Sequence, residues 1–579
     1  MKSNLFLFIA LVSLMISSNF KASSQLTSDC KFTGNETLNY QDCIDKYSEF
    51  SSSEFGYLKE FGSTDIGEPL HLFILSSDDL NEKKLSNKKV TILINNAIHP
   101  GEPCGVDASV MFVNTILDDE NLESILSKVN IAIIPMYNIG GGLNRGCCSR
   151  ANQNGPAFYG FRGNAKNLDL NRDFIKCDSK NAKAFSSIYH YVKPHIFLDT
   201  HTSNGADYQY VMTLITTQPD KATPPVRSYL NNVMVDELYS KMEAVGYPMA
   251  PYVHTLGSTP DDGIKDYLET PRYSTGYSTL FNALGFVSET HMLKPYSERV
   301  QSTYELMIQL LNFSEERCDE IIEMKNRADT FSKALNTFDI SWKLDTNRYE
   351  EFMFKGYEAK YKKSEFSRNQ RLYYDQDAPY EKVIKYYNRY PADLRIEAPD
   401  YYIIPQAWSK VISLLKLNGV SLTPLDQDSL MDVEFYFIEN YETAPNPYEG
   451  HYIHSNVKLT SKKVTQKFRK GDYMVPVNQF SNRYVVETLE PEGPDSFFAW
   501  NFFDSVLQQK EWFSTYVFED VAAEMLKTDP ELKAEFVQKQ KESDDFSENQ
   551  WAQLYWLYKK SANYEPTHNR YPVARYSIN

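Results

Sequence analysis

One short stretch, residues 98–103, constrains the fold and the function of this chain more than any other. It reads Ile-His-Pro-Gly-Glu-Pro and contains His99 and Glu102. The apolar, β-branched run 90–94 before it predicts a buried strand, and the apolar spacing in 105–117 predicts a helix after it. We therefore expect both polar side chains on a turn at the carboxyl end of a strand, where open α/β sheets place their sites.

An imidazole nitrogen and a carboxylate oxygen three residues apart can bind one Zn²⁺ ion. The ion then needs a third protein ligand and, in a catalytic site, an open fourth position. Alone, the pattern His-x-x-Glu is more typical of surface pairs. A second histidine, His201, follows the apolar segment 195–199 in the same way. A histidine there could be a hydrogen-bonded core residue, but with His99 and Glu102 it completes a set of three ligands.

Residues 144–173 form a long polar stretch without a clear helix or strand pattern, which is typical of a functional or a disordered loop. The alternative interpretation is a set of solvated surface arginines. Asparagine and glycine, rather than lysine and glutamate, separate these arginines, and the stretch lies between two strands that end in candidate ligands. It therefore predicts a substrate-binding loop, whose candidate residues are Arg145, Arg150, Arg162, Asn171 and Arg172.

Glu289 ends a further apolar segment, Gly-Phe-Val-Ser-Glu, which starts at residue 285 and predicts a strand. Burying a carboxylate costs several kcal/mol unless it is paired or coordinated. A functional role for Glu289 is therefore predicted.

The length of 579 residues exceeds one typical hydrophobic core, so we expect two or three domains. Residues 1–24 have the three parts of a secretory signal peptide, which predicts a secreted or periplasmic protein. No other stretch is apolar enough to be a transmembrane segment. The net charge of −17 argues against nucleic acid and anionic membrane surfaces as partners.

The composition changes near residue 339, after the last of these motifs. We expect the domain that carries the motifs at 25–330, a small β-rich accessory domain at 335–490 and a helical segment at 491–579. Alternation in Tyr473-x-Val475-x-Val477 and in Tyr484-x-Val486 predicts strands in the second region. No catalytic set of residues is found after residue 330.

Taken together, the motifs resemble those of the zinc metallocarboxypeptidase family, typified by the pancreatic carboxypeptidases. The resemblance covers about residues 50–320. It depends on four features in the family's order and with comparable separations: His99-x-x-Glu102, Asp169-x-Asn171-Arg172, His201 after Asp199-Thr200, and Glu289 at a strand end. It implies an α/β fold with a mixed, mostly parallel eight-stranded sheet between helices.

The resemblance also implies a role for each motif residue. His99, Glu102 and His201 are the expected zinc ligands. Asp169 is the expected acceptor that orients His99. Glu289 is the expected general base. The expected clamp for the substrate's terminal carboxylate consists of Asn171 and Arg172.

Two further roles are assigned less directly, because loop lengths in this chain differ from the family pattern. For the arginine that polarises the scissile carbonyl we choose Arg150, with Arg145 in reserve. For the family's mobile tyrosine we choose Tyr277 over Tyr273 and Tyr267. The side-chain specificity stays open, and the charged candidates before Glu289 are Asp261, Asp262, Asp266 and Arg272.

The leading function is an exported zinc-dependent carboxypeptidase acting on peptides with a free carboxyl terminus. The second is a zinc amidase for cell-wall peptides with D-amino-acid or γ-linked bonds, or for acylated amino acids, because related hydrolases use the same ligand set. The third is a non-catalytic binding protein, against which the complete set of ligands and Glu289 argues.

Overall fold

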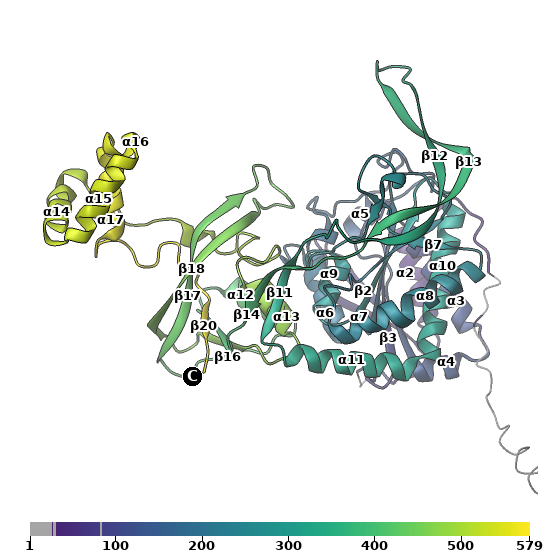
Figure 1. Cartoon of the computed structure of the whole chain (residues 1–579). Coiled ribbons are helices and arrows are strands. Elements are labelled where there is room, and N and C mark those ends of the chain that lie inside the picture. The colour runs from purple at the N-terminus through teal and green to yellow at the C-terminus, as the bar shows by residue number, and fades with distance from the viewer. Residues whose placement is uncertain (1–25, 27–29, 81–83, 579) are drawn as a thin grey trace, which may run out of the picture.

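The computed structural model describes residues 26, 30–80 and 84–578, so the predicted signal peptide lies outside the described residues. Its centre is an eight-stranded sheet in the order β1-β2-β4-β3-β5-β10-β6-β7 (Figure 1). The strands are β1 (Gly56–Ser63), β2 (Pro69–Leu75), β3 (Val90–Asn95), β4 (Val129–Ile134), β5 (Ile196–Ser203), β6 (Met212–Thr216), β7 (Met249–Pro251) and β10 (Leu284–His291).

Strands β4, β3, β5 and β10 pair in parallel, as do β6 and β7, whereas β1–β2, β2–β4 and β10–β6 are antiparallel. This confirms the expected mixed, mostly parallel sheet. Every residue of β3 and β4 is buried, which explains why both read as continuous apolar runs rather than alternating ones.

The parallel register aligns the polar ends of the central strands. Asn95 at the end of β3 lies opposite Asp199 of β5, and Glu289 of β10 lies opposite His201 of β5. Paired residues of neighbouring strands point to the same face of a sheet. The side chains predicted from separate motifs therefore lie close together at the carboxyl ends of these strands.

Helices cover both faces of this sheet, as the alternation along β5 demonstrates. Thr200 lies so close to Gly105 of α3 (Cys104–Leu117) that no side chain fits there. Phe197, which points the other way, packs against Phe185 of α6 (Lys180–Val192), with ring centroids 5.9 Å apart. Hence α3 and α6 lie on opposite faces.

Other helices extend these two layers. Helix α10 (Tyr296–Glu316) joins α3 through the Thr115–Tyr304 hydroxyl pair, at 2.8 Å. Helix α9 (Ser274–Thr279) joins α6 through the rings of Tyr277 and Tyr189. The remaining helices of this part are α2 (Tyr40–Phe50), α4 (Leu122–Lys128), α5 (Ile139–Leu143), α7 (Pro224–Tyr229), α8 (Val235–Ala244) and α11 (Cys318–Lys333). No helix among the described residues is both long and apolar enough to cross a bilayer.

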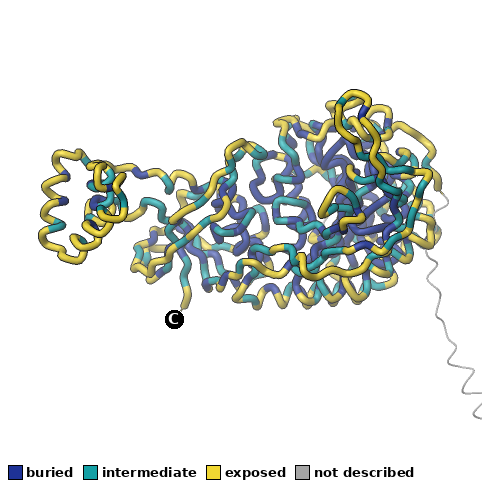
Figure 2. The backbone as a smooth tube through the Cα atoms, turned by 45° about the horizontal axis from the view of Figure 1, so that its top comes forward, coloured by how far each residue is buried: buried dark blue, intermediate teal, exposed yellow. Residues whose placement is uncertain are grey.

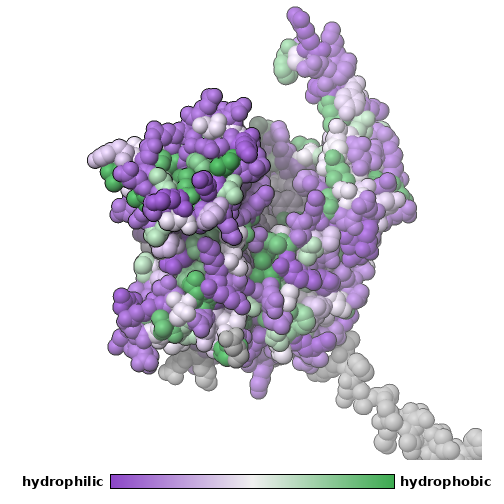
Figure 3. Space-filling view, turned by 60° about the vertical axis from the view of Figure 1, so that its left-hand side comes forward, coloured by the Kyte–Doolittle hydropathy of each residue, from purple (hydrophilic) through white to green (hydrophobic). Residues whose placement is uncertain are grey.

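Beyond α11 the chain is rich in strands, as expected. Strands β12 (Glu350–Lys363) and β13 (Gln370–Tyr387) form a hairpin that projects from the body (Figures 1 and 3). Its turn carries Phe366, which is 96% exposed. The base of the hairpin is tied to the first part of the chain, because β13 pairs with β9 (Ile264–Lys265), which pairs with β8 (His254–Thr255). A short pair, β11 (Thr337–Trp342) with β14 (Ala392–Glu397), lies beside it in the sequence.

A six-stranded antiparallel sheet follows. Its order is β16 (Thr423–Pro424), β19 (Tyr473–Pro476), β15 (Tyr401–Ile404), β20 (Ala574–Tyr576), β17 (Ser429–Thr443) and β18 (His454–Phe468). The strand predicted at Tyr473 is confirmed as β19. The one predicted at Tyr484 is wrong, because Tyr484 lies in helix α13 (Asn482–Leu489). All eight residues of α13 are buried, and the Tyr484-x-Val486 pattern is too short to separate a strand from a helix.

The last region is helical, with a core of its own built around Phe518 and Leu557. It contains α14 (Thr515–Thr528), α15 (Pro530–Glu542), α16 (Asp544–Ser547) and α17 (Gln550–Lys560), and α12 (Ser409–Leu417) precedes it in the chain. Figure 2 shows that most of this end is exposed, whereas buried backbone concentrates around the eight-stranded sheet. The chain then returns to the six-stranded sheet as β20, which the helical assignment of 491–579 did not anticipate. The domain boundaries themselves stay predictions.

Candidate metal centre

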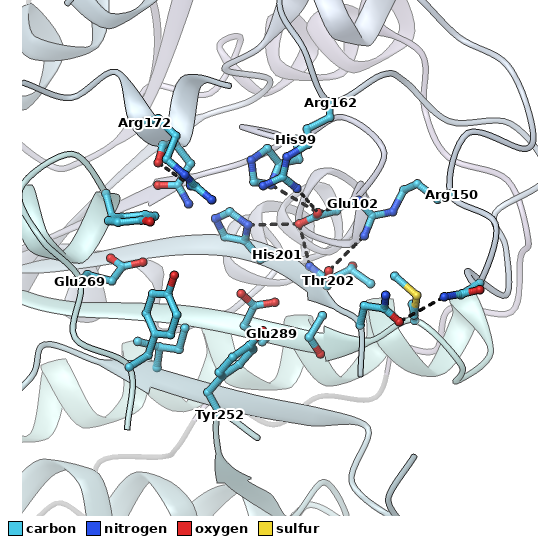
Figure 4. Close-up of a pocket in the computed structure, with 18 of the residues that line it drawn as sticks. His99, Glu102, Arg150, Arg162, Arg172, His201, Thr202, Tyr252, Glu269 and Glu289 are labelled. Carbon is cyan, nitrogen blue, oxygen red and sulfur yellow. Dashed lines mark hydrogen bonds and ion pairs between the residues drawn. The ribbon is translucent and has the colours of Figure 1, made fainter. Parts of the chain in front are cut away.

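Three side chains from two strand ends converge on one point. His99 and Glu102 lie on the turn after β3, and His201 lies near the end of β5 (Figure 4). All three are buried, and one potential ligand atom of each lies within 4.8 Å of the other two. The Nδ1 atoms of His99 and His201 are 3.3 Å and 3.1 Å from the two carboxylate oxygens of Glu102.

Each imidazole is fixed by a second carboxylate on its other nitrogen. His99 Nε2 lies 2.9 Å from Asp169 Oδ1, and His201 Nε2 lies 2.9 Å from Asp199 Oδ2. This arrangement keeps the proton on Nε2 and turns both Nδ1 lone pairs inward. His99 Nδ1 is buried and has no hydrogen-bond partner among the residues that the structure describes. Two imidazole nitrogens and one carboxylate that face a common point, one of the nitrogens without a hydrogen-bond partner among the described residues, fit the ligand set of a zinc ion.

The contact between Asp169 and His99 is the one that the resemblance implies, whereas Asp199 received no role from the sequence. We predict that Asp199→Asn weakens zinc binding by about 10- to 100-fold, because the amide holds the His201 ring less strongly than a carboxylate does. Competition with a chromogenic chelator measures this. Asp107→Asn is the matched control, because Asp107 is buried and its contacts are to Leu38 and Tyr296. Equal zinc affinity in the Asp199 variant would contradict the assignment.

Glu289 lies beside this centre, on β10. Figure 4 shows its carboxylate turned toward the three ligands. It forms no ion pair within the described part of the chain. Burial raises the pKa of Glu289 to about 8, with the neighbouring charge of Glu102 adding to the effect. A divalent cation at the adjacent ligands would lower this pKa again, because it favours the ionised form.

A cavity of about 450 Å³ opens over these groups. Asn171 and Arg172 line it at one end, where the guanidinium of Arg172 lies 4.3 Å from the ring centroid of Tyr273. Asn171 Oδ1 accepts a hydrogen bond of 3.1 Å from the backbone N–H of Ser274. The cavity therefore combines a candidate metal centre, a buried carboxylate and a fixed guanidinium.

The sequence pattern that defines the family of zinc carboxypeptidases matches residues 51–354, just over half of the chain. This chain belongs to the zinc carboxypeptidase family. Curated proteins show no match to it.

Three solved structures illustrate what the chain is similar to. A candidate carboxypeptidase A from Shewanella denitrificans is 18% identical, with a TM-score of 0.38, covering 50% of this chain and 73% of that one. A metallo-carboxypeptidase from Burkholderia cenocepacia is 15% identical, with a TM-score of 0.36 and coverages of 48% and 70%. A metallo-carboxypeptidase from Pseudomonas aeruginosa, in complex with (2-guanidinoethylmercapto)succinic acid, is 14% identical, with a TM-score of 0.37 and coverages of 49% and 70%.

Two arginines of this family member reach Glu102. Arg150 donates to Glu102 Oε1 at 2.8 Å, to Gln153 Oε1 at 2.6 Å and to the backbone carbonyl of Thr202 at 3.1 Å. Arg162 lies 3.5 Å from the same Glu102 oxygen, and its side chain is 44% exposed. It also pairs with Asp169 at 2.9 Å. Arg150 is thus held on three sides, whereas Arg162 reaches the cavity from its solvent-exposed wall.

Two of the expected site residues lie elsewhere. Arg145 donates to the backbone carbonyls of Thr37, Leu38 and Phe158 and does not line the cavity. It holds the chain before α2, so its assignment to substrate is wrong.

The choice of Tyr277 is also wrong, because this residue is fully buried. Its hydroxyl donates to Asn418 Oδ1 at 2.6 Å, and its ring packs among the aromatic side chains of α6. The helical turn of α9 directs it into the core. Tyr267 and Tyr273, which the sequence left as alternatives, line the cavity instead.

Other lining residues had no sequence signal that singles them out. Tyr252 and Glu269 line the cavity, and each lies in a stretch without a clear periodic pattern. The four charged candidates for specificity do not line it. Asp262 caps a turn at Thr259, Asp266 bonds to Gln218, Asp261 lies near Lys382, and Arg272 pairs with Asp495.

The C-terminal region contacts the walls of this site. Glu449 Oε2 accepts a hydrogen bond of 2.7 Å from the backbone N–H of Asp169, the residue that holds His99. Asp495 receives two hydrogen bonds from Arg272, at 2.6 Å and 2.9 Å, and this guanidinium also lies over the ring of Trp500. Arg272 precedes Tyr273 of the cavity wall, so these contacts fix one side of the cavity.

We predict that Asp495→Ala lowers the free energy of unfolding by about 3–5 kcal/mol, because it leaves a buried guanidinium without its partner. Arg272 is 15% exposed in its side chain and Asp495 is 1% exposed. Denaturant unfolding followed by circular dichroism measures the change. Glu524→Ala is the control, since its pair with Lys527 is exposed and contributes little. Equal effects of the two variants would show that the Arg272–Asp495 pair does not stabilise the fold.

Proposed function

We propose that this protein is an exported carboxypeptidase that removes one residue at a time from the carboxyl end of peptides. One observation carries the proposal: a single cavity joins the His99–Glu102–His201 centre to Glu289 and to the guanidinium of Arg172. A cation fixed at one end of a hydrolytic cavity favours substrates that end in a carboxylate.

His99, Glu102 and His201 would hold zinc, which lowers the pKa of a water molecule from 15.7 to about 7 and polarises a carbonyl. Glu289 accepts a proton from the attacking water and passes it to the leaving amine, a role that typically contributes about 10²–10⁴-fold. Its position on β10, in register with His201, supports this role because the carboxylate faces the same edge of the sheet as the ligands.

We assign the carbonyl-polarising role to Arg162 rather than Arg150. A guanidinium that stabilises the negative charge developing on the carbonyl oxygen must have free donors on the substrate side. Arg150 is bonded to Gln153, Glu102 and Thr202 and its side chain is only 15% exposed, which makes it a support for Glu102. Arg162 is bonded to Asp169 and lies 3.5 Å from Glu102, but its side chain is 44% exposed, so its guanidinium is the more accessible of the two to a substrate.

Arg172 and Asn171 bind the terminal carboxylate. The planar guanidinium offers two parallel donors to a carboxylate, a geometry that lysine cannot supply. The guanidinium carbon of Arg172 lies over the ring of Tyr273, 4.3 Å from its centroid, and this contact fixes the orientation of the guanidinium. Secretion or delivery to the periplasm belongs to the same proposal and is supported by the signal-peptide pattern of residues 1–24.

The test is digestion of a peptide library by the purified protein, with and without a chelator, read by mass spectrometry. Loss of one carboxyl-terminal residue at a time, abolished by the chelator, is the expected result. Cleavage only of D-amino-acid or γ-linked peptides would replace the proposal with the cell-wall amidase. Intact peptides under all conditions would favour a non-catalytic binding protein.

A further inference from the structure

Glu269 is a buried carboxylate in the substrate cavity to which neither the metal centre nor the proposed mechanism gives a role. It is 5% exposed, and it lines the cavity together with Arg172 and Tyr273. The other two carboxylates among the described lining residues are Glu102, a metal ligand, and Glu289. A third carboxylate in such a place needs a physical reason, since its burial is costly.

Within the described part of the chain, hydrogen bonds reach one of the two carboxylate oxygens of Glu269. Oε2 accepts hydrogen bonds from the backbone N–H and the hydroxyl of Thr275, at 2.7 Å and 2.5 Å, and from the backbone N–H of Gly276 at 3.3 Å. Oε1 has no hydrogen-bond partner among the described residues. Figure 4 shows the carboxylate turned into the cavity, on the same side as Arg172. The side chain is thus anchored by one oxygen and presents the other.

No cationic side chain of the described residues forms an ion pair with this carboxylate. Lys221, a buried lysine, donates to the backbone carbonyl of Glu269 at 3.1 Å and to that of Gly276 at 3.4 Å, rather than to the carboxylate. No ion pair of Glu269 exists within the described ranges, whereas Arg150, Arg162 and Arg172 each pair with Glu102 or Asp169. Burial raises the pKa of Glu269 accordingly. A cationic group of the substrate would pair with the carboxylate and offset the free-energy cost of burying it.

The surroundings of Glu269 suit a long side chain that ends in a cation. Tyr252, Tyr267, Tyr273 and Ile215 line the same cavity. Aromatic faces and an aliphatic side chain pack well against a methylene stem, and tyrosine rings also attract a cationic head group. Arg172, at the same end, is the proposed partner of the terminal carboxylate. The side chain of the residue that bears this carboxylate therefore starts close to Glu269.

We propose that Glu269 selects substrates whose last residue carries a cationic side chain, lysine or arginine, by pairing with its head group. This inference rests on the proposed function, because it takes Arg172 as the clamp for the terminal carboxylate. It explains why this position holds a carboxylate that forms no ion pair with any described residue.

The first test compares benzoyl-Gly-Gly-Lys, benzoyl-Gly-Gly-Arg and benzoyl-Gly-Gly-Leu as substrates of the full-length zinc-loaded protein. The wild type should show kcat/KM values for the two basic substrates at least about 10²-fold above that for the leucine substrate. Glu269→Gln should lower the Lys:Leu ratio by about 10²-fold, because glutamine preserves the anchoring oxygen but not the charge. Asp261→Asn removes a carboxylate outside the cavity and should leave the ratio at its wild-type value.

A wild type without preference for basic residues, or an unchanged ratio in the Glu269 variant, would overturn the inference. So would an equal fall for all three substrates, because that result indicates a general structural role. If no peptide is cleaved, the proposed function fails, and calorimetry still decides about Glu269. Lysine should then bind more tightly than its uncharged isostere norleucine, and Glu269→Gln should abolish the difference. Equal binding of the two amino acids by the wild type would reject the cation site.

Discussion

Glu289→Gln lowers kcat by about 10³-fold while the protein still binds zinc with its three ligands. The reason is that glutamine matches the shape of the side chain but cannot accept a proton, so the attacking water and the leaving amine lose their shuttle. The ligands His99, Glu102 and His201 are untouched. Steady-state kinetics on a peptide substrate, together with metal analysis of the purified variant, measures both parts of the result.

The control for this variant is Glu298→Gln, which changes an exposed glutamate on α10 outside the cavity. It should keep wild-type turnover. Equal turnover in the Glu289 variant would refute the general-base assignment. Loss of zinc in the Glu289 variant would show instead that the carboxylate maintains the metal centre rather than moving a proton.

The second large effect is expected for Arg172→Ala. The variant should lower kcat/KM by about 10²- to 10³-fold for peptides with a free carboxyl terminus, because a hydrogen-bonded charge pair with the substrate is lost. Peptides with an amidated terminus never form this pair and should change far less. The ratio of the two rate constants, measured on one peptide in both forms, isolates the contribution of the clamp.

Arg172→Lys should restore little of this ratio, because lysine lacks the planar pair of donors. Arg145→Ala is the matched control, since that arginine bonds only to backbone carbonyls outside the cavity. If free and amidated peptides are affected alike by Arg172→Ala, the carboxylate is bound elsewhere.

The C-terminal region contacts the walls of the candidate site. The sequence after residue 330 has no catalytic motif. Glu449 bonds to the backbone of Asp169 across 280 residues of sequence, and Asp495 pairs with Arg272 across 223. These contacts reach the residue that orients His99 and the wall that carries Tyr273. The region is therefore part of the frame of the site.

The central features of the site could be predicted because they are local. His99, Glu102, His201 and Glu289 each follow a short apolar run, and such runs identify buried strands. Parallel strands bring their carboxyl ends to one edge, so four separate motifs implied one centre before any contact was known. The family match supports the same set of ligands.

The remaining choices depended on side-chain directions in long loops, where no periodicity applies. Arg150 and Arg162 were two arginines in one polar stretch, and only the bonds of Arg150 to Gln153 and Thr202 separate their roles. Tyr277, Tyr273 and Tyr267 all lie between His201 and Glu289, and only the structure reveals that the turn of α9 points Tyr277 into the core. Alternation at Tyr484 and Val486 indicated a strand, but two positions are too few to separate a period of 2 from the helical period, and both residues lie in α13.

The amino-acid sequence by itself indicated the buried strands, the candidate metal ligands at their ends and the carboxylate of Glu289, and the family resemblance added the eight-stranded sheet and the role of the Asn171-Arg172 pair. Strand ends and short motifs specify these features through neighbours in the chain. Only the tertiary structure decided which arginine and which tyrosines face the cavity, that Glu269 presents a free oxygen there, and that the C-terminal region supports its wall. Those features depend on contacts between residues far apart in the sequence, and local periodicity carries no information about such contacts.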